Sequence, residues 1–218
     1  MSPETEFKRF LGPIERVSEI LFGLIMVLTV TGSISVMEAN RGVVRDLFIA
    51  ALGCNLAWGV IDAVLYLMGR FSERGQNILA LRAVQTTQDA DKARRVISDA
   101  LPPLIASVLT GAELDAIHQR LKRVPEPPAY PRLAKNDWLG GLGVFLLVFA
   151  STFPVLIPFL FIHDAKLALR ISNLIAIVLL FILGSMVGRY AAHRRWLTGL
   201  AMVILGGVLV AITIALGG

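Results

Sequence analysis

Asp62 is the residue of this sequence whose position points most clearly to chemistry, because it lies inside a long apolar segment. An ionised side chain near the middle of a bilayer costs roughly 2.5–3.5 kcal/mol or more, so it normally faces a partner, a cavity or a pathway. Asn55 lies seven residues earlier and Tyr66 four residues later, on one face of a helix. Gly59 opens space between them. This stripe predicts a cation or proton path, and the alternative is a structural hydrogen bond or a salt bridge, for example to Arg189.

Glu19 is a second carboxylate, near the start of the first apolar segment. Met26 follows seven residues later, on the same helical face and about 10 Å deeper at a rise of 1.5 Å per residue. A carboxylate followed by a thioether suits a borderline metal such as ferrous iron. We therefore predict Asp62 and Glu19 as metal or proton ligands, assisted by Asn55 and Met26. The alternatives are that Glu19 pairs with Arg16 and that Met26 is ordinary packing.

The composition argues against most other functions. The chain is 56% hydrophobic with a mean hydropathy of +0.70, and only 17% of its residues are charged. A soluble domain carries about a quarter charged residues. The net charge of +5 is therefore attributed to the loops of a membrane protein rather than to nucleic-acid binding. Cys54 is the single cysteine, which excludes an intramolecular disulfide and a CxxC metal site. No nucleophile has a nearby base, so we expect neither an enzyme nor a resident cofactor, although a divalent metal can be the cargo.

Five apolar segments must position these residues, since a helix crosses a bilayer with roughly 20 apolar residues. They cover residues 17–36, 47–68, 138–162, 171–192 and 196–216. Trp138 and Trp196 each open a segment, where an indole ring suits the headgroup level. The first segment lacks a cleavage pattern and is expected to be retained as a helix. The sequence thus predicts an all-α integral membrane protein with two spans in residues 1–69 and three in residues 137–218.

A charged segment, residues 70–136, separates the second span from the third and predicts a cytoplasmic helical insert that ends in a Pro-rich linker. Thr110 and Glu113 match a capping box at the start of a helix. Apolar residues on one face of that helix predict packing within the insert or against a second copy. A ligand-binding or partner-binding surface is the alternative.

The distribution of basic residues predicts the orientation. The amino terminus, the insert and the loop between the last two spans hold 17 Lys and Arg residues, and the opposite side holds 4. Basic residues collect on the cytoplasmic side, so the amino terminus is expected in the cytoplasm and the carboxyl terminus outside. Without organelle-targeting features, the plasma (inner) membrane is the expected location.

The last three spans carry residues that shape helices. Gly184 and Gly188 form a GxxxG pair that lets two helices approach closely. Pro154 and Pro158 free backbone carbonyls that must be satisfied inside the protein or by a water-filled cavity.

The same region resembles a known family. Phe-Pro-Val-Leu-Ile-Pro-Phe-Leu-Phe at 153–161 is similar to the third span of the vacuolar iron transporter family, and residues 180–189 and 199–207 look like its fourth and fifth spans. The layout of two spans, an insert and three spans also agrees. The resemblance implies a homodimer that exports ferrous iron or manganese from the cytoplasm, in exchange for protons, through a path near the first spans.

Two features depart from that family. Its members usually carry Asp-Gly-Leu in the first span, where this sequence has Phe22-Gly23-Leu24 and Glu19 one turn away. Iron-transporting members have a glutamate-rich insert, whereas this insert is basic. Three hypotheses follow: a proton-coupled exporter of divalent metal, a relative that carries another substrate, or a non-transporting membrane protein whose cytoplasmic helices recruit a partner.

Overall fold

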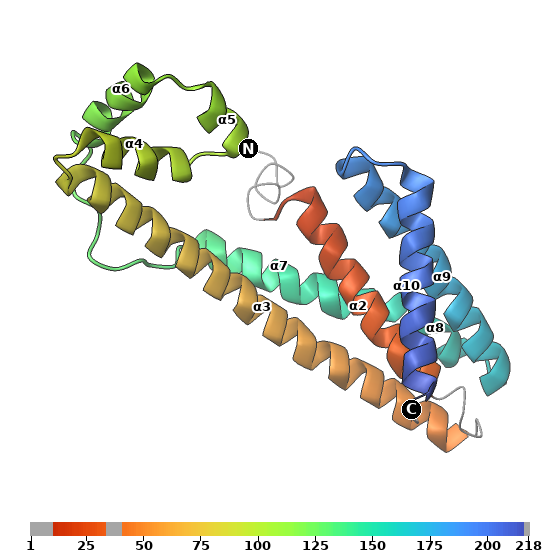
Figure 1. Ribbon diagram of the computed structural model, residues 1–218. Coiled ribbons are helices and arrows are strands. Elements are labelled where there is room, and N and C mark those ends of the chain that lie inside the picture. The colour runs from red at the N-terminus through yellow and green to blue at the C-terminus, as the bar shows by residue number, and fades with distance from the viewer. Residues whose placement is uncertain (1–10, 34–40, 216–218) are drawn as a thin grey trace, which may run out of the picture. The chain divides into compact units, whose positions relative to one another are not determined.

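The computed structural model describes residues 11–33 and 41–215, and its regular structure in these ranges is entirely helical, as predicted (Figure 1). Residues 34–36, the predicted end of the first span, and Leu216, the predicted end of the last, lie outside the described residues. The helices are α2 (Pro13–Ser33), α3 (Arg41–Thr86), α4 (Ala90–Asp99), α5 (Pro103–Val108), α6 (Gly111–Leu121), α7 (Lys135–Ser151), α8 (Phe153–Phe161), α9 (Ala165–Tyr190) and α10 (Arg195–Ala215).

Within the described residues, four segments are long and apolar enough to cross a membrane. They are Phe48–Thr86, Lys135–Phe161, Leu167–Tyr190 and Arg195–Ile212, which correspond to the last four predicted spans. The helix α2 has 21 residues, but Glu15, Arg16 and Glu19 occupy its first two turns. Its role as a fifth span therefore stays a prediction.

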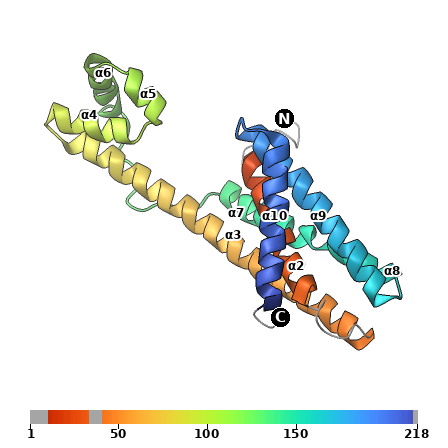
Figure 2. The same ribbon diagram turned by 45° about the vertical axis from the view of Figure 1, so that its right-hand side comes forward.

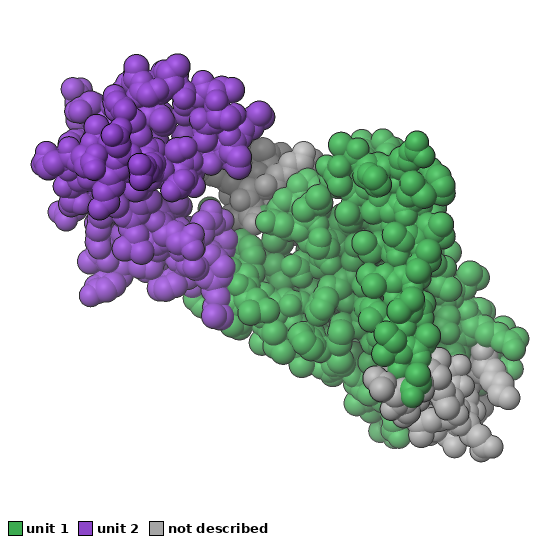
Figure 3. Space-filling model, in the orientation of Figure 1, with its two compact units in different colours: residues 1–66, 136–218 green, residues 67–135 purple. Residues whose placement is uncertain are grey.

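The chain divides into two compact units, coloured separately in Figure 3: unit 1 comprises residues 1–66 and 136–218, and unit 2 comprises residues 67–135. In unit 1, α2, α8 and α10 pack against α9 (Figures 1 and 2). The core between them is apolar and includes Leu24 and Val27 of α2, Leu156 of α8 and Leu180 of α9.

Large apolar side chains also cover the outside of unit 1. Leu174 and Ile204, for example, are 60% and 57% exposed. An apolar surface on this scale suits lipid rather than water. The structure thus supports an integral membrane protein.

Small residues bring α9 and α10 together. A Cβ atom added to Gly184 would lie 2.7 Å from Met202 Cγ, and one added to Gly188 would lie 2.6 Å from Thr198 Oγ1. Gly199 makes the reciprocal approach, since its Cβ would lie 2.8 Å from the Phe181 carbonyl oxygen. Larger residues at these positions would force the helices apart.

The third predicted span is not one continuous helix, because α7 ends at Ser151 and α8 begins at Phe153. Pro154 lies in the first turn of α8 and Pro158 inside it, and neither has an N–H to donate. Ser172 of α9 donates to the Val155 carbonyl at 2.7 Å, which ties α8 to its neighbour.

The second predicted span ends earlier than its helix. The prediction placed the end near Met68, whereas α3 continues to Thr86. No proline or turn-forming cluster interrupts residues 69–86, so the helix persists after the apolar run has ended.

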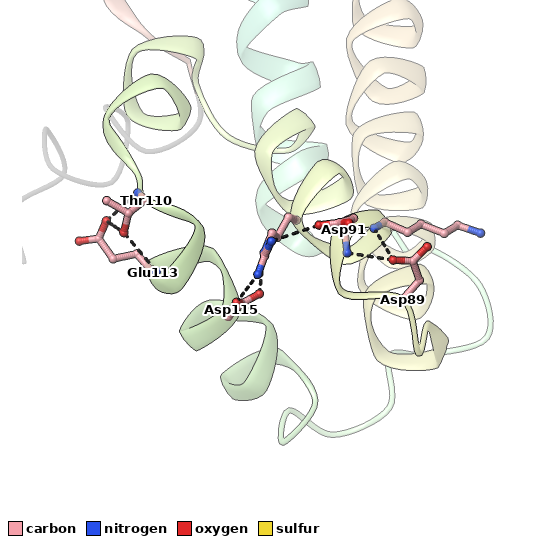
Figure 4. A network of polar contacts seen from close by, with 7 residues as sticks. Asp89, Asp91, Thr110, Glu113 and Asp115 are labelled. Carbon is pink, nitrogen blue, oxygen red and sulfur yellow. Dashed lines mark hydrogen bonds and ion pairs between the residues drawn. The ribbon is translucent and has the colours of Figure 1, made fainter.

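Unit 2 contains that extension of α3 together with α4, α5, α6 and the Pro-rich linker. Arg94 of α4 donates to both carboxylate oxygens of Asp115 of α6, at 2.8 and 2.6 Å. Figure 4 shows this contact beside the start of α6. The predicted capping box is confirmed: Glu113 N donates to Thr110 Oγ1 at 3.4 Å, and Thr110 N donates to Glu113 Oε2 at 2.8 Å.

Candidate functional site

The two predicted carboxylates, Glu19 and Asp62, lie on helices α2 and α3, which contact each other through the rings of Phe22 and Trp58. Both side chains are half-buried. Asp62 Oδ2 is buried and has no hydrogen-bond partner among the described residues. Arg189 is exposed in the last turn of α9, and within the described part of the chain it forms no ion pair with Asp62. The salt bridge suggested between Asp62 and Arg189 is therefore absent from the described part of the chain.

The neighbours of Glu19 on α2 are engaged elsewhere. Arg16 donates to the Leu11 carbonyl through Nε at 3.0 Å and Nη2 at 2.9 Å. Glu15 accepts from the backbone N–H of Gly12 at 2.6 Å. The neighbours of Glu19 on its own helix thus bind backbone groups at the start of α2.

Met26 lies two turns beyond Glu19 on α2 and is half-buried. In the described ranges, its sulfur makes no hydrogen bond to either carboxylate. The spacing from Glu19 holds as predicted, but the structure does not join the thioether to the carboxylate pair.

Asn55 has a different setting, because it ties three helical segments together. It is only 1% exposed, and its Nδ2 donates to the Gly23 carbonyl of α2 at 3.2 Å and to Thr152 Oγ1 between α7 and α8. Its Oδ1 is buried and lacks a hydrogen-bond partner among residues 11–33 and 41–215. The structural alternative accordingly accounts for the Nδ2 group of Asn55.

Gly23 is a point of close contact between α2 and α7. A Cβ atom there would overlap Ser151 Oγ and lie 2.7 Å from the Val148 carbonyl oxygen. Its own carbonyl accepts the hydrogen bond from Asn55. Only glycine allows α2 to approach this closely.

The predicted stripe on α3 faces α7 as well as α2. A Cβ atom on Gly59 would lie 3.1 Å from Phe145 Cδ2, and one on Gly140 would overlap the ring of Tyr66. The expectation that Gly59 opens space between the polar residues is wrong, because the Phe145 ring fills that space. Asp62 and Asn55 are therefore separated by a packed contact.

An aromatic pair lies at Phe22, the position for which the sequence resemblance implied an aspartate. Phe22 of α2 meets Trp58 of α3 edge to face, with ring centroids 5.6 Å apart and an interplanar angle of 75°. Such pairs add packing energy beyond the area that they bury. This position supplies no oxygen ligand.

Two polar residues of this region were not predicted from the sequence. Thr152 is fully buried and accepts a hydrogen bond from Asn55, and Asp137 is 3% exposed in the first turn of α7. A threonine two residues before Pro154 is typical of a helix start, and an acidic residue suits the first turn of a helix. Both patterns indicate where the helices begin, but they do not predict which groups Thr152 and Asp137 contact.

The carboxylate pair alone does not complete a metal site. The described residues contain no group of three or more His, Cys, Asp or Glu side chains that could hold a metal ion. Divalent cations that prefer oxygen bind about six ligands. Backbone carbonyls, water or a second copy of the chain would have to supply the others.

The comparison with known families identifies the chain's relatives. The model of the VIT family matches residues 77–218, which include the end of α3, the insert and α7 to α10. This match confirms the resemblance to vacuolar iron transporters predicted from residues 153–207. Glu19, Asn55 and Asp62 precede the matched range. No curated protein matches the chain.

Proposed function

The chain belongs to the VIT family, and from this premise we propose that it exports a divalent metal, ferrous iron or manganese, from the cytoplasm in exchange for protons. The observation that carries the proposal is a pair of carboxylates, Glu19 and Asp62, on two helices of an apolar unit that contact each other through Phe22 and Trp58. The cation is the substrate, and the protein needs no resident cofactor.

Electrostatics explains why such a pair would exchange ions. Two ionised carboxylates that face each other in an apolar setting are unfavourable. One divalent cation neutralises the pair, and so do two protons. The two kinds of ion therefore compete for the same oxygens, and export of the metal is accompanied by entry of protons. Carboxylate oxygens suit manganese well. The thioether of Met26, two turns beyond Glu19 on α2, would favour ferrous iron at that depth of the path.

The remaining ligands point to a homodimer. A single copy supplies only two carboxylates at this position, and the exposed apolar residues Leu65 and Met68 lie on the same helix as Asp62. A second copy seated on α3 would cover that surface and add its own side chains. We propose this dimer in the plasma membrane, with the amino terminus in the cytoplasm.

A second candidate function is transport of another substrate on the same scaffold. Phe22 packs against Trp58 where family members usually carry an aspartate. A site with one oxygen ligand fewer would bind a divalent metal more weakly and would favour protons or a less charged substrate.

Metal flux into proteoliposomes tests the proposal. Purified protein would be supplied with ferrous iron or manganese, with and without a pH gradient, and compared with Asp62→Asn and Glu19→Gln. We expect saturable, gradient-sensitive flux that falls at least tenfold in both variants, because each loses one of the two charges. The matched control is Asp46→Asn, which makes the same change at an exposed position of α3 and should leave flux unchanged.

Each outcome has a distinct meaning when folding is checked by thermal melting. Folded wild-type protein that moves neither metal would exclude metal export. Flux of protons alone that depends on Asp62 would support the second candidate. If Asp62→Asn lowers the melting temperature without changing flux, the carboxylate is structural.

A further inference from the structure

A basic cavity of about 330 Å³ lies in unit 2, between the extension of α3 and the Pro-rich linker. Its walls are formed by Arg74, Asn77, Ile78, Pro128, Pro131 and Arg132. Unit 2 is described in full, and the residues that line this cavity include two arginines and an amide but no carboxylate. The cavity thus combines donors with an apolar wall.

Side chains of α3 hold the linker against the helix, beside this cavity. Arg82 Nη2 donates to the Pro128 carbonyl at 2.9 Å, and Gln85 Nε2 donates to the Val124 carbonyl at 2.8 Å. A Cβ atom on Gly75 would lie 3.8 Å from Pro131 Cγ, so the linker contacts α3 again at Pro131. Prolines restrict the backbone between these contacts. The restricted linker backbone therefore holds Arg132 at the same cavity as Arg74.

The charge around the cavity is positive. The extension of α3 (residues 69–86) and the linker (residues 122–134) carry six basic residues, Arg70, Arg74, Arg82, Lys122, Arg123 and Arg132, against Glu73 and Glu126. Glu73 is already engaged, because its Oε2 lies 2.5 Å from Arg70 Nη1. A cation would be repelled from this cavity, and an anion would be attracted.

Phosphate is the anion that this donor set fits best. A guanidinium group presents parallel N–H donors that match two phosphate oxygens, and charge-assisted pairs of this kind are strong. The amide of Asn77 adds a neutral donor. Arg74 lies six residues after Met68, or about 9 Å further along the helix axis. If α3 leaves the hydrocarbon at Met68, Arg74 reaches the layer of lipid headgroups.

We propose that this cavity binds a phosphate group through Arg74 and Arg132. The source is either the headgroup of an anionic phospholipid or free phosphate in the cytoplasm. The site is separate from the carboxylate pair, and its existence does not depend on the proposed metal export.

Two binding measurements on the purified full-length protein distinguish the sources. Native mass spectrometry would count phosphatidylglycerol and phosphatidylcholine molecules retained by the protein, and calorimetry would follow inorganic phosphate with chloride as the reference anion. The test variant is Arg74→Gln with Arg132→Gln. The matched control is Arg120→Gln with Arg123→Gln, which removes the same charge from exposed positions outside the cavity.

We expect at least a tenfold loss of affinity in the test variant and less than a threefold change in the control. A loss for phosphatidylglycerol identifies the lipid headgroup, and a loss for inorganic phosphate identifies the free anion. Equal loss in both double variants would show attraction by diffuse charge and would overturn the site, as would the absence of saturable binding of either probe. Arg132→Lys alone keeps the charge on an exposed linker residue, so a loss there reflects guanidinium geometry rather than misfolding.

Discussion

Gly23 shows how one residue determines the contact of α2 with α7 and α3. Its missing side chain admits Ser151 and the Val148 carbonyl, while its own carbonyl accepts from Asn55. The backbones of α2 and α7 are thus in contact at Gly23. The Asn55 side-chain amide, which donates to the Gly23 carbonyl, also donates to Thr152 at this point. Such a packed junction tolerates little added volume.

Gly23→Ala is expected to destabilise the protein by about 1–3 kcal/mol, the usual cost of overpacking. The added Cβ would meet the Val148 carbonyl at 2.7 Å, and backbone atoms cannot rotate away. The matched control is Gly53→Ala on α3, where a Cβ would have no neighbour within 4 Å. Alanine favours helix over glycine by roughly 0.8–1 kcal/mol, so the control should be neutral or stabilising. Thermal melting in detergent measures both, and equal melting temperatures would refute the proposed close contact.

The residues of this junction mark what the sequence could not predict. Asp62 and Glu19 were recognised because a carboxylate in an apolar run is unusual by itself. The partners of Asn55 were not, since Thr152 lies 97 positions away and a periodic pattern contains no distances between helices. Gly59 was misread for the same reason, because the Phe145 ring that fills its space comes from another helix.

Helix ends were predicted more accurately where hydrophobicity and helix formation end together. The run 171–192 ends within two residues of α9 (Ala165–Tyr190), although that helix begins six residues earlier, and the run 196–216 matches α10 over its described length. For α3 the two signals separate: apolar residues stop near Met68, but good helix formers continue to Thr86. An apolar run marks the exit from a membrane, and a cap or a breaker marks the end of a helix.

The end of α9 carries local strain that can be tested. Ala192 has a φ angle of 51°, while His193 N donates to the Gly188 carbonyl and Ala191 N to the Val187 carbonyl, each at 2.9 Å. The bond from His193 N to the Gly188 carbonyl is the 6→1 hydrogen bond of a Schellman motif, and Ala192 occupies the position where glycine is usual. Ala192→Gly should therefore stabilise the protein by about 0.5–1 kcal/mol, seen as a higher melting temperature. Ala191→Gly, one residue earlier and without a positive φ, should lower it, and the opposite order would contradict the assignment.

The α4–α6 pair should weaken in acid. The hydrogen bond from Arg94 holds the pKa of Asp115 below its ordinary value of 3.8, and hydrogen bonds from Thr110 lower the pKa of Glu113. A depressed pKa in the folded state means that the stabilisation is present above the ordinary value and is lost as the pH falls through the depressed one. Spin labels placed at Lys92 and Gln119 of a Cys54→Ala protein report the separation of α4 and α6. The distribution of distances between them should therefore broaden below about pH 4.

Asp115→Asn is the variant that isolates this effect. It should broaden the same distance distribution already at pH 7 and flatten its dependence on pH. Asp99→Asn is the control, because Asp99 is exposed on α4 and, within unit 2, forms no ion pair. A distribution that Asp115→Asn leaves unchanged from pH 7 to pH 3 would show that the ion pair does not hold the two helices.

At the scale of the whole molecule, the open question is how often the chain crosses the membrane. Ser107 in α5 and His163 after α8 are both exposed, and one apolar segment, Lys135–Phe161, separates them. They must therefore lie on opposite sides for either four or five spans. The excess of Lys and Arg, 17 against 4 when five spans are counted, predicts that the insert lies in the cytoplasm.

Cysteine labelling with a membrane-impermeant maleimide in intact cells tests this arrangement on a Cys54→Ala background. His163→Cys should react at once and Ser107→Cys only after the cells are permeabilised, and the reverse pattern would invert the orientation.

A third cysteine, Thr5→Cys, decides the role of α2. If α2 and α3 both cross, Thr5 and Ser107 share one side and react together. If Glu15, Arg16 and Glu19 keep α2 out of the hydrocarbon, the cysteine at position 5 is labelled under the same conditions as the cysteine at position 163. Glu19 and Asp62 would then lie at the membrane surface rather than inside a transport path.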